Sequence, residues 1–217
     1  MEYPFDSKFK KIIDESEIGW DFLFSRPTQF LLEYMNLELL DNLEKNGYPG
    51  ETVQKHFDEL RTWTTDALFE RAIADDDDSP ALGLLQSSDS REIFERASLS
   101  CRSTNPEERA IGVCVLMRTP GRTFHDEAGE LREALVERLE DTHEECRHEA
   151  ILGLAKRHDG RVKPALLKAL QSKKVWRMAI DAAKELADPD FYERLIELRY
   201  GDTEDYLEEA IAACRPN

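Results

Sequence analysis

A dipeptide of alanine followed by isoleucine recurs four times in the second half of the chain, at intervals of roughly 30 to 40 residues. Each pair lies in a stretch whose apolar residues are spaced as on one face of an α-helix. A side chain as small as alanine lets a neighbouring helix approach closely, so its recurrence predicts helices that stack on one another. The four pairs are Ala110-Ile111, Ala150-Ile151, Ala179-Ile180 and Ala210-Ile211.

Short breaks separate these helical stretches and divide the second half of the chain into helical hairpins. The breaks contain Pro or Gly, as at Asn105-Pro106, Asp159-Gly160 and Asp188-Pro189. A single hairpin cannot bury its own apolar face, whereas consecutive hairpins can cover one another. The sequence therefore predicts an all-α fold, an α-solenoid of stacked helical hairpins.

The first 88 residues also have helical spacing but show no clear repeat. One helix is expected to begin at Thr28, and a second is expected to run without interruption from Thr52 to Ala74. The acidic run from Asp75 to Asp78 is expected in a loop, because negative charges at a helix C-terminus oppose the helix dipole. We therefore predict an irregular helical region at residues 1–88 and a repeat region, one continuous solenoid, at residues 89–217.

The net charge of −17 constrains the class of partner. A surface this acidic repels nucleic acid and anionic membranes. No apolar run approaches the roughly 18 residues of a membrane-spanning helix, and the first residues are too polar for a secretory signal. The four cysteines lie far apart without a Cys-x-x-Cys pair, as expected of reduced, buried thiols. These features predict a cytoplasmic protein that does not associate with membranes.

The segment from Leu135 to Leu170 contains a recurrent pattern, in which a leucine-rich helix ends in Leu-x-Asp and is followed by an Arg, an Ala and Leu-Gly-Leu. Asp141 and Arg147 are the Asp and Arg of this pattern. It resembles the HEAT-like repeats named after phycobilisome lyases, over about residues 90–214. The resemblance implies a binding role, and it implies that Asp141 and Arg147 tie adjacent repeats together by hydrogen bonds.

The neighbouring repeats depart from this pattern. In the next repeat Ser172 stands where the Asp is expected, and Trp176 stands where the Arg is expected. In the preceding repeat Glu107 stands at the Arg position. The sequence therefore supports the tie at one junction only.

A basic band, residues 156–184, lies inside the acidic chain. Residues 151–184 contain nine Lys and Arg but only two acids, Asp159 and Asp181. Either these bases form a surface that binds an acidic protein segment or phosphates, or they pair with acids of neighbouring repeats. Trp176 favours a binding surface, because Trp and Arg are frequent anchors of interfaces. The candidate binding residues are Arg161, Lys168, Lys173, Lys174, Trp176 and Arg177.

The densest cluster of potentially reactive side chains surrounds Cys146. His143 and Cys146 lie three residues apart and could share a metal on one helical face, whereas His148 points elsewhere. Thr142 with Glu145 matches a capping box, so the start of a helix explains the cluster better than a metal site. The sequence lacks a phosphate-binding loop and a nucleophile elbow. It predicts neither a metal site nor catalytic residues.

Together these patterns predict a non-catalytic binding module or scaffold, without a cofactor, that recognises a protein partner through its helical-repeat surface. Two alternatives stay open. A nucleic-acid-binding protein would use the basic band, although the net charge disfavours it. An enzyme of unknown type would use His143, Cys146 and His148.

Overall fold

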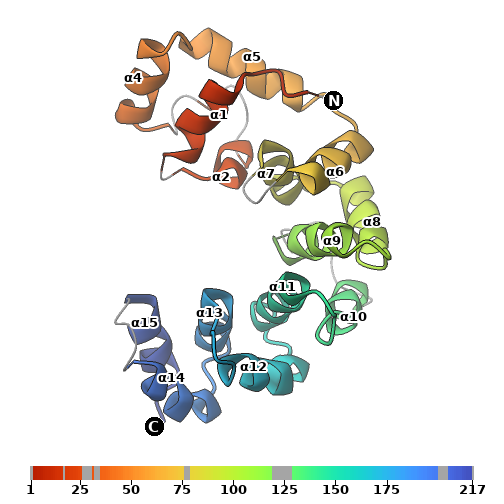
Figure 1. The fold of residues 1–217 in the computed structure, drawn as a ribbon, viewed down its shortest axis with the longest axis vertical. Helices are drawn as coiled ribbons and strands as arrows, with labels where there is room; N and C mark the ends of the chain where they lie inside the picture. The colour runs from red at the N-terminus through yellow and green to blue at the C-terminus, as the bar shows by residue number, and fades with distance from the viewer. Residues whose placement is uncertain are drawn as a thin grey trace. The chain divides into compact units, whose positions relative to one another are not determined.

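The computed structural model describes residues 2–16, 18–25, 31, 35–75, 79–118, 129–199 and 205–216. All regular secondary structure in these ranges is helical, which confirms the predicted all-α class (Figure 1). The chain divides into two compact units, Met1–Arg96 with Arg118–Thr123 and Ala97–Met117 with Phe124–Asn217. The boundary at residues 88 and 89 stays a prediction.

The first unit is built around aromatic side chains. Trp20 stacks on Phe57 with ring centroids 5.8 Å apart, and the ring of Phe24 lies 4.8 Å from that of Phe57. Gly83 allows two helices to pack closely, because a Cβ atom at this position would lie 2.5 Å from the Cβ atom of Trp20. The helices are α1 (Ser7–Asp14), α2 (Trp20–Phe24), α4 (Leu37–Lys45), α5 (Gly50–Leu60), α6 (Thr65–Ala74), α7 (Pro80–Ser87) and the first part of α8 (Arg91–Ser100).

The single helix predicted from Thr52 to Ala74 is wrong. The chain leaves the helical path after Leu60, and α6 begins afresh at Thr65. The side chain of Thr64 caps this second helix by accepting a hydrogen bond from the backbone N–H of Ala67. The predicted start at Thr28 and the acids Asp76–Asp78 lie outside the described residues.

The second unit contains the repeats. The elements are α9 (Pro106–Arg118), α10 (Glu130–Val136), α11 (Glu144–Ala155), η3 (Gly160–Val162), α12 (Lys163–Leu170), α13 (Arg177–Leu186), η4 (Pro189–Phe191), α14 (Tyr192–Leu198) and α15 (Asp205–Ala213). Four of these helices, α9, α11, α13 and α15, each contain one of the repeated alanines. A short 3-10 turn precedes α12, and another precedes α14.

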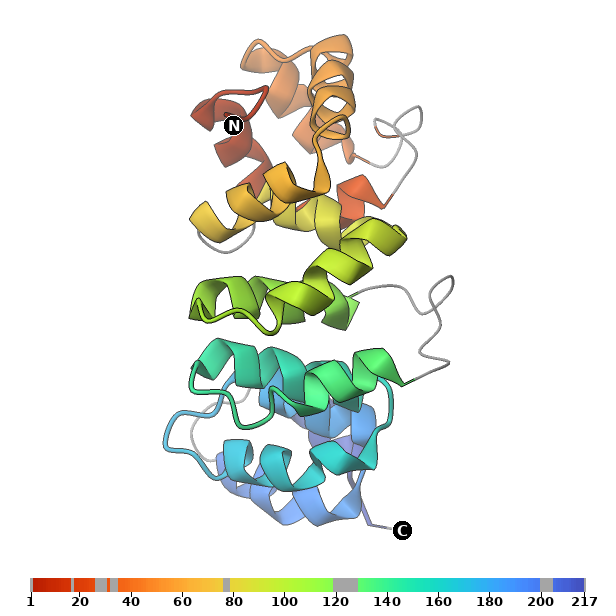
Figure 2. The ribbon, with the colours of Figure 1, turned by 90° about the vertical axis from the view of Figure 1, so that its right-hand side faces the viewer.

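Helices of the second unit form two layers (Figure 1). In one layer α11 packs on α13, and α13 packs on α15. The second layer consists of α10, α12 and α14, which pack on α11, α13 and α15 respectively. Gly153 of α11 lies against Met117 of α9, so these two helices are neighbours (Figure 2). Ala110, Ala150 and Ala179 are buried, as is Ala210. The predicted stacking of alanine-bearing helices is therefore present.

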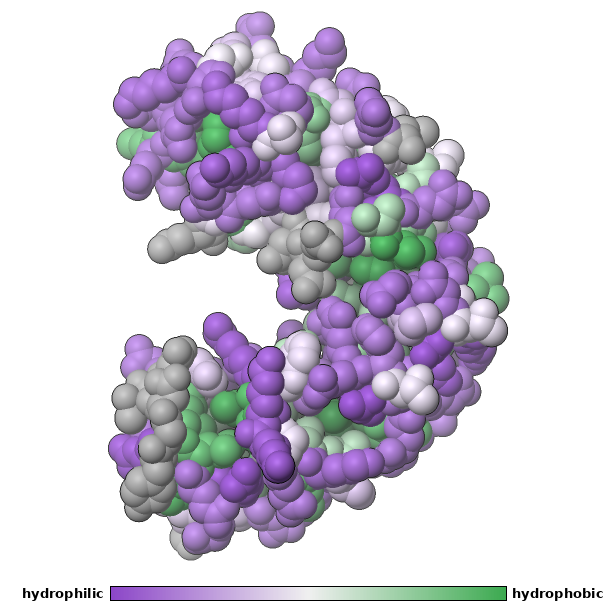
Figure 3. Space-filling view, viewed as in Figure 1, coloured by the Kyte–Doolittle hydropathy of each residue, from purple (hydrophilic) through white to green (hydrophobic). Residues whose placement is uncertain are grey.

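The surface of both units is dominated by hydrophilic side chains on the face seen in Figure 3. This agrees with a chain in which 35% of the residues are charged. None of the described helices is both long enough and apolar enough to span a lipid bilayer.

Candidate functional site

Several bases of the basic band form ion pairs within the second unit. Arg161 donates to Asp159 and to Glu133, with N···O distances of 2.6 and 2.5 Å. Lys163 lies 2.8 Å from Asp188 and 2.6 Å from Asp190, which belong to the next repeat. Lys184 pairs with Glu209. Acids of the same unit therefore neutralise the positive charges of Arg161, Lys163 and Lys184, and no bound ligand is needed to do so.

Three of the remaining candidates, Lys173, Lys174 and Trp176, lie in the turn between α12 and α13, residues 171–176. Lys173 is exposed and has no ion pair or hydrogen bond among the described residues. The Nζ atom of Lys174 lies 5.5 Å from the centre of the Trp176 ring. Lys168 reaches Glu140 at 3.2 Å, but both side chains are 75% exposed, so this pair contributes little to stability.

Arg177 begins α13 directly after this turn. Its Nε atom lies 3.6 Å from Asp181, and its guanidinium lies 5.0 Å from the centre of the Tyr206 ring. The structure therefore separates the six candidates. Arg161 is held by acids, whereas Lys173, Lys174 and Trp176 form one cluster, which we call the turn cluster.

Trp176 connects the turn cluster to α11. Its ring is stacked on the imidazole of His148, with centroids 5.0 Å apart and an angle of 15° between the planes. His148 is 6% exposed, and burial lowers its pKa, so the imidazole is neutral near pH 7. Its Nδ1 atom is buried without a hydrogen-bond partner among the described residues.

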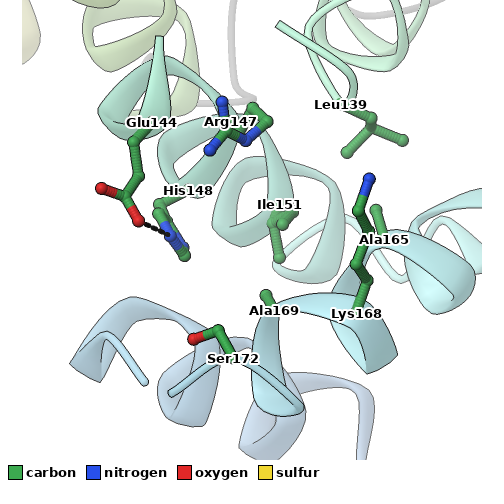
Figure 4. Close-up of a pocket in the computed structure, with 9 residues that line it drawn as sticks. All are labelled: Leu139, Glu144, Arg147, His148, Ile151, Ala165, Lys168, Ala169 and Ser172. Atoms are coloured by element: carbon green, nitrogen blue, oxygen red, sulfur yellow. Dashed lines mark ion pairs between the residues drawn. The ribbon is translucent and has the colours of Figure 1, made fainter. Parts of the chain in front are cut away.

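A pocket of about 150 Å³ lies beside this stack, between α11 and α12 (Figure 4). Side chains from α11 line one side and side chains from α12 line the other. Its apolar lining consists of Leu139, Ile151, Ala165 and Ala169. Its polar lining consists of Glu144, Arg147, His148, Lys168 and Ser172. We call it the Arg147 pocket.

Arg147 and Arg109 occupy the same place in successive repeats. Each is the fourth residue of its helix, α11 and α9 respectively. The Nη1 atom of each donates to the two carbonyl oxygens six and five residues earlier in the chain. These acceptors are Ser103 and Thr104 for Arg109, at 3.0 and 3.2 Å, and Asp141 and Thr142 for Arg147, at 2.6 and 3.1 Å.

This equivalence corrects the alignment of the first repeat. Alignment of the repeats on their Ala-Ile pairs puts Glu107 at the Arg position. The helix starts show that the register differs by two residues, and Arg109 takes the position. Glu107 instead lies 3.6 Å from the imidazole of His143.

Asp141 joins the two repeats. Its oxygens accept hydrogen bonds from Nε and Nη2 of Arg109, both at 2.8 Å, and from the backbone N–H of His143 at 2.9 Å. The side chains of Asp141 and Arg109 are only 4% and 11% exposed. The hydrogen bonds from Arg109 hold the pKa of Asp141 at about 2, below its usual range. The resemblance was therefore right that Asp141 ties adjacent repeats, with Arg109 as its partner. It was wrong for Arg147, which donates to the carbonyl oxygens of the turn before its own helix.

The equivalent acid is missing at the next junction. Ser172 takes its place in the Leu-x-Asp pattern, and Lys174 takes its place when positions are counted back from the start of α13. Neither side chain is negative. The Nε and Nη2 atoms of Arg147 consequently have no hydrogen-bond or ion-pair partner among the described residues.

A family model of HEAT repeats matches residues 132–215. This part of the chain consists of HEAT-like repeats. This confirms the resemblance drawn from Asp141 and Arg147. The match covers α11 to α15 and therefore includes the turn cluster and the Arg147 pocket.

The X-ray structure of YibA from Escherichia coli is 17% identical, with 98% of each chain covered and a TM-score of 0.40. At this similarity it carries no argument about the present chain. No curated protein matches.

His143, Cys146 and His148 have different surroundings. Cys146 is buried, and burial raises the pKa of its thiol to about 12, which keeps it protonated. His143 and His148 face different acids, Glu107 and Glu144. The described residues contain no group of three or more His, Cys, Asp or Glu side chains arranged to hold a metal ion.

The capping box predicted for Thr142 and Glu145 is wrong. His143 is the residue that precedes α11, and no side chain caps this helix by the expected hydrogen bond. Instead, Oδ1 of Asp141 accepts a hydrogen bond from the backbone N–H of His143, the residue before α11.

Sequence reasoning missed the Arg147 pocket. It treated Arg147 as a purely structural residue and did not connect His148 with Trp176. One signal was available, since Ser172 interrupts the Leu-x-Asp pattern and thereby removes the acid that would satisfy an arginine.

Proposed function

We propose that this protein is a non-catalytic binding module that recognises a protein partner through its second unit, at the turn cluster of Lys173, Lys174 and Trp176. HEAT repeats generally mediate protein interactions, because stacked hairpins present an extended surface of helices and turns. In this protein we assign that general role to the turn cluster.

The observation that carries the proposal is the contrast within the basic band. Arg161, Lys163 and Lys184 are paired with acids. Among the described residues, by contrast, Lys173 has no partner and the ammonium of Lys174 lies over the ring of Trp176. A Trp flanked by two such lysines combines apolar contact area with positive charge, as interface anchors do. An acidic protein segment is the complementary partner.

The net charge of −17 does not oppose such binding at short range. At physiological salt, charges more than about 8 Å apart are largely screened. A partner segment in contact with the turn cluster therefore senses the two lysines more strongly than the distant acids. Nucleic acid is the less favoured partner, because a long phosphate backbone needs a continuous basic surface and most bases of the band are engaged.

Affinity capture from an extract of the source cells tests the proposal. The full chain is compared with the double variant Lys173→Glu, Lys174→Glu. The matched control is Lys45→Glu, Lys55→Glu, which changes the net charge equally but lies in the first unit. We expect a protein that is retained by the full chain and the control, and lost with the turn-cluster variant. Equal retention by all three contradicts the proposal.

A nuclease treatment of the extract separates the alternative. Loss of the captured material after nuclease treatment, together with a low-salt gel shift by the purified protein, would indicate nucleic acid as the partner. Retention after nuclease treatment supports a direct protein contact.

A further inference from the structure

We propose that the Arg147 pocket binds the carboxylate of a single Asp or Glu side chain of the protein partner. This inference rests on the proposed function and gives it a chemical specificity. The partner's acid would occupy in trans the position that Asp141 occupies in cis at the preceding junction.

The preceding junction shows how a carboxylate binds this arginine position. There, the side chain of Arg109 uses Nη1 for the carbonyl oxygens of its own turn and offers Nε and Nη2 together to Asp141. Arg147 has its Nη1 engaged in the same way. Its Nε–Nη2 edge is thus held in place with two parallel donors, the arrangement that matches a carboxylate.

The pocket provides the space that a side chain from another molecule needs. Ile151, Ala165 and Ala169 give it an apolar lining that suits the methylene groups of Asp or Glu, and Lys168 adds a second positive charge (Figure 4). Among the residues that the structure describes, the Lys168 ammonium is held by one exposed ion pair, with Glu140, and breaking this pair costs little free energy.

His148 gives an independent indication of a missing ligand. It lines the pocket and is 6% exposed, yet its Nδ1 atom has no hydrogen-bond partner among the described residues. Buried polar atoms are nearly always satisfied in folded proteins, so this nitrogen is an unused hydrogen-bonding atom in a residue that lines the pocket.

The negative charges around the pocket favour a carboxylate over a phosphate. The carboxylate of Glu144 also lines the pocket, 3.8 Å from Nε2 of His148, and Glu140 lies next to Lys168. These two carboxylates already offset the two positive charges of Arg147 and Lys168, so a ligand with one negative charge is repelled less than a ligand with two. A phosphate, with close to two charges at neutral pH, would meet Glu144 without a third cation to offset it.

Titrations of the full chain with small probes test the inference. The probe is N-acetylglutamate N-methylamide, its neutral match is N-acetylglutamine N-methylamide, and inorganic phosphate is the third arm. The readout is the position of the backbone amide signals of Arg147, His148 and Ser172 in ¹H–¹⁵N spectra at constant ionic strength. We expect the glutamate probe to shift these signals and the glutamine probe to leave them unchanged.

Two variants connect the pocket with the partner. Ser172→Asp places an acid in the pocket lining, and Ser172→Asn is its neutral match. We expect Ser172→Asp to remove the probe-induced shifts and to weaken capture of the partner about 10-fold, and Ser172→Asn to change neither. Arg147→Met should likewise remove the shifts and weaken capture. If Arg147→Met does not fold, Ser172→Asp still tests the inference.

The outcomes separate this inference from the proposed function. Equal shifts with both amino-acid probes, shifts with phosphate alone, or no shifts at all would overturn the carboxylate site. Undiminished capture by Ser172→Asp, combined with loss of capture in the Lys173→Glu, Lys174→Glu variant, would overturn the pocket while leaving the turn cluster as the binding surface.

Discussion

Arg109 and Arg147 make the same pair of hydrogen bonds to the turn before their helix, but they differ in what the rest of the guanidinium contacts. At the first junction Nε and Nη2 bind Asp141, which belongs to the following repeat. At the second junction the acid is replaced by Ser172 or Lys174, and the stack of Trp176 on His148 joins the repeats instead.

The two junctions show that adjacent repeats can be held together in two ways, which differ in whether a charged side chain is left available for binding. A repeat can be stabilised either by a buried, fully paired Arg–Asp tie or by stacked rings, since both hold one hairpin against the next. Only the second solution leaves charged donors beside an open pocket. A departure from a structural pattern within a repeat protein is therefore a place to look for binding.

Removing each arginine should expose the largest difference between the junctions. Arg109→Met and Arg147→Met lose the same hydrogen bonds to the backbone. Only Arg109→Met also leaves Asp141, whose side chain is 4% exposed, without its main partner. We expect Arg109→Met to lower the free energy of unfolding by about 3 kcal/mol and Arg147→Met by about 1 kcal/mol. Urea denaturation followed by circular dichroism measures both, and equal losses would break the comparison.

Acidification should weaken the first junction. The pKa of Asp141 is about 2 in the folded protein and near 3.8 when it is unpaired, so its ionised form stabilises the fold above about pH 4. This contribution is lost as the pH falls from about 4 towards 2. We expect the loss to amount to about 1 to 2 kcal/mol, and we expect Asp141→Asn to lack this part of the pH dependence. Denaturation series at several pH values provide the measurement, and an unchanged slope in Asp141→Asn would show that the carboxylate is not paired.

Supplying the missing acid should make the second junction resemble the first. Ser172→Asp is expected to raise the free energy of unfolding by about 0.5 kcal/mol, the size of a solvent-exposed pair, because its carboxylate can approach Arg147. Ser172→Asn is the neutral control. In the Arg147→Met background the gain should vanish, which a double-mutant cycle detects. A gain that survives without Arg147 would have a different origin.

The sequence was sufficient to predict the repeats, because helical spacing and buried alanines depend on local periodicity. It also located the Leu-x-Asp motif around Asp141 correctly. It misaligned the first repeat, since the length of a turn is not evident from identical dipeptides, and Arg109 was therefore overlooked. The break between α5 and α6 was missed as well, because apolar spacing continues through residues 61–64 although Thr64 starts a new helix.

The candidate site was predictable only in part. The basic band was evident from composition, but which of its bases are paired depends on contacts between residues 25 to 28 positions apart, such as Lys184 with Glu209 and Arg161 with Glu133. The stack of Trp176 on His148 likewise joins two helices of different hairpins. Such contacts follow from the stacking geometry and not from any local pattern.

Solvent exchange of the arginine Nε–Hε protons tests the central comparison most directly. These protons can be followed for Arg109 and Arg147 in one sample by ¹H–¹⁵N spectroscopy of the full chain. The Nε–Hε proton of Arg109 is bonded to Asp141 in a nearly buried pair and should exchange slowly. The Nε–Hε proton of Arg147 has no partner among the described residues and should exchange rapidly. Equal exchange rates, or slower exchange at Arg147, would contradict the conclusion that one junction is closed by its own acid and the next is left open.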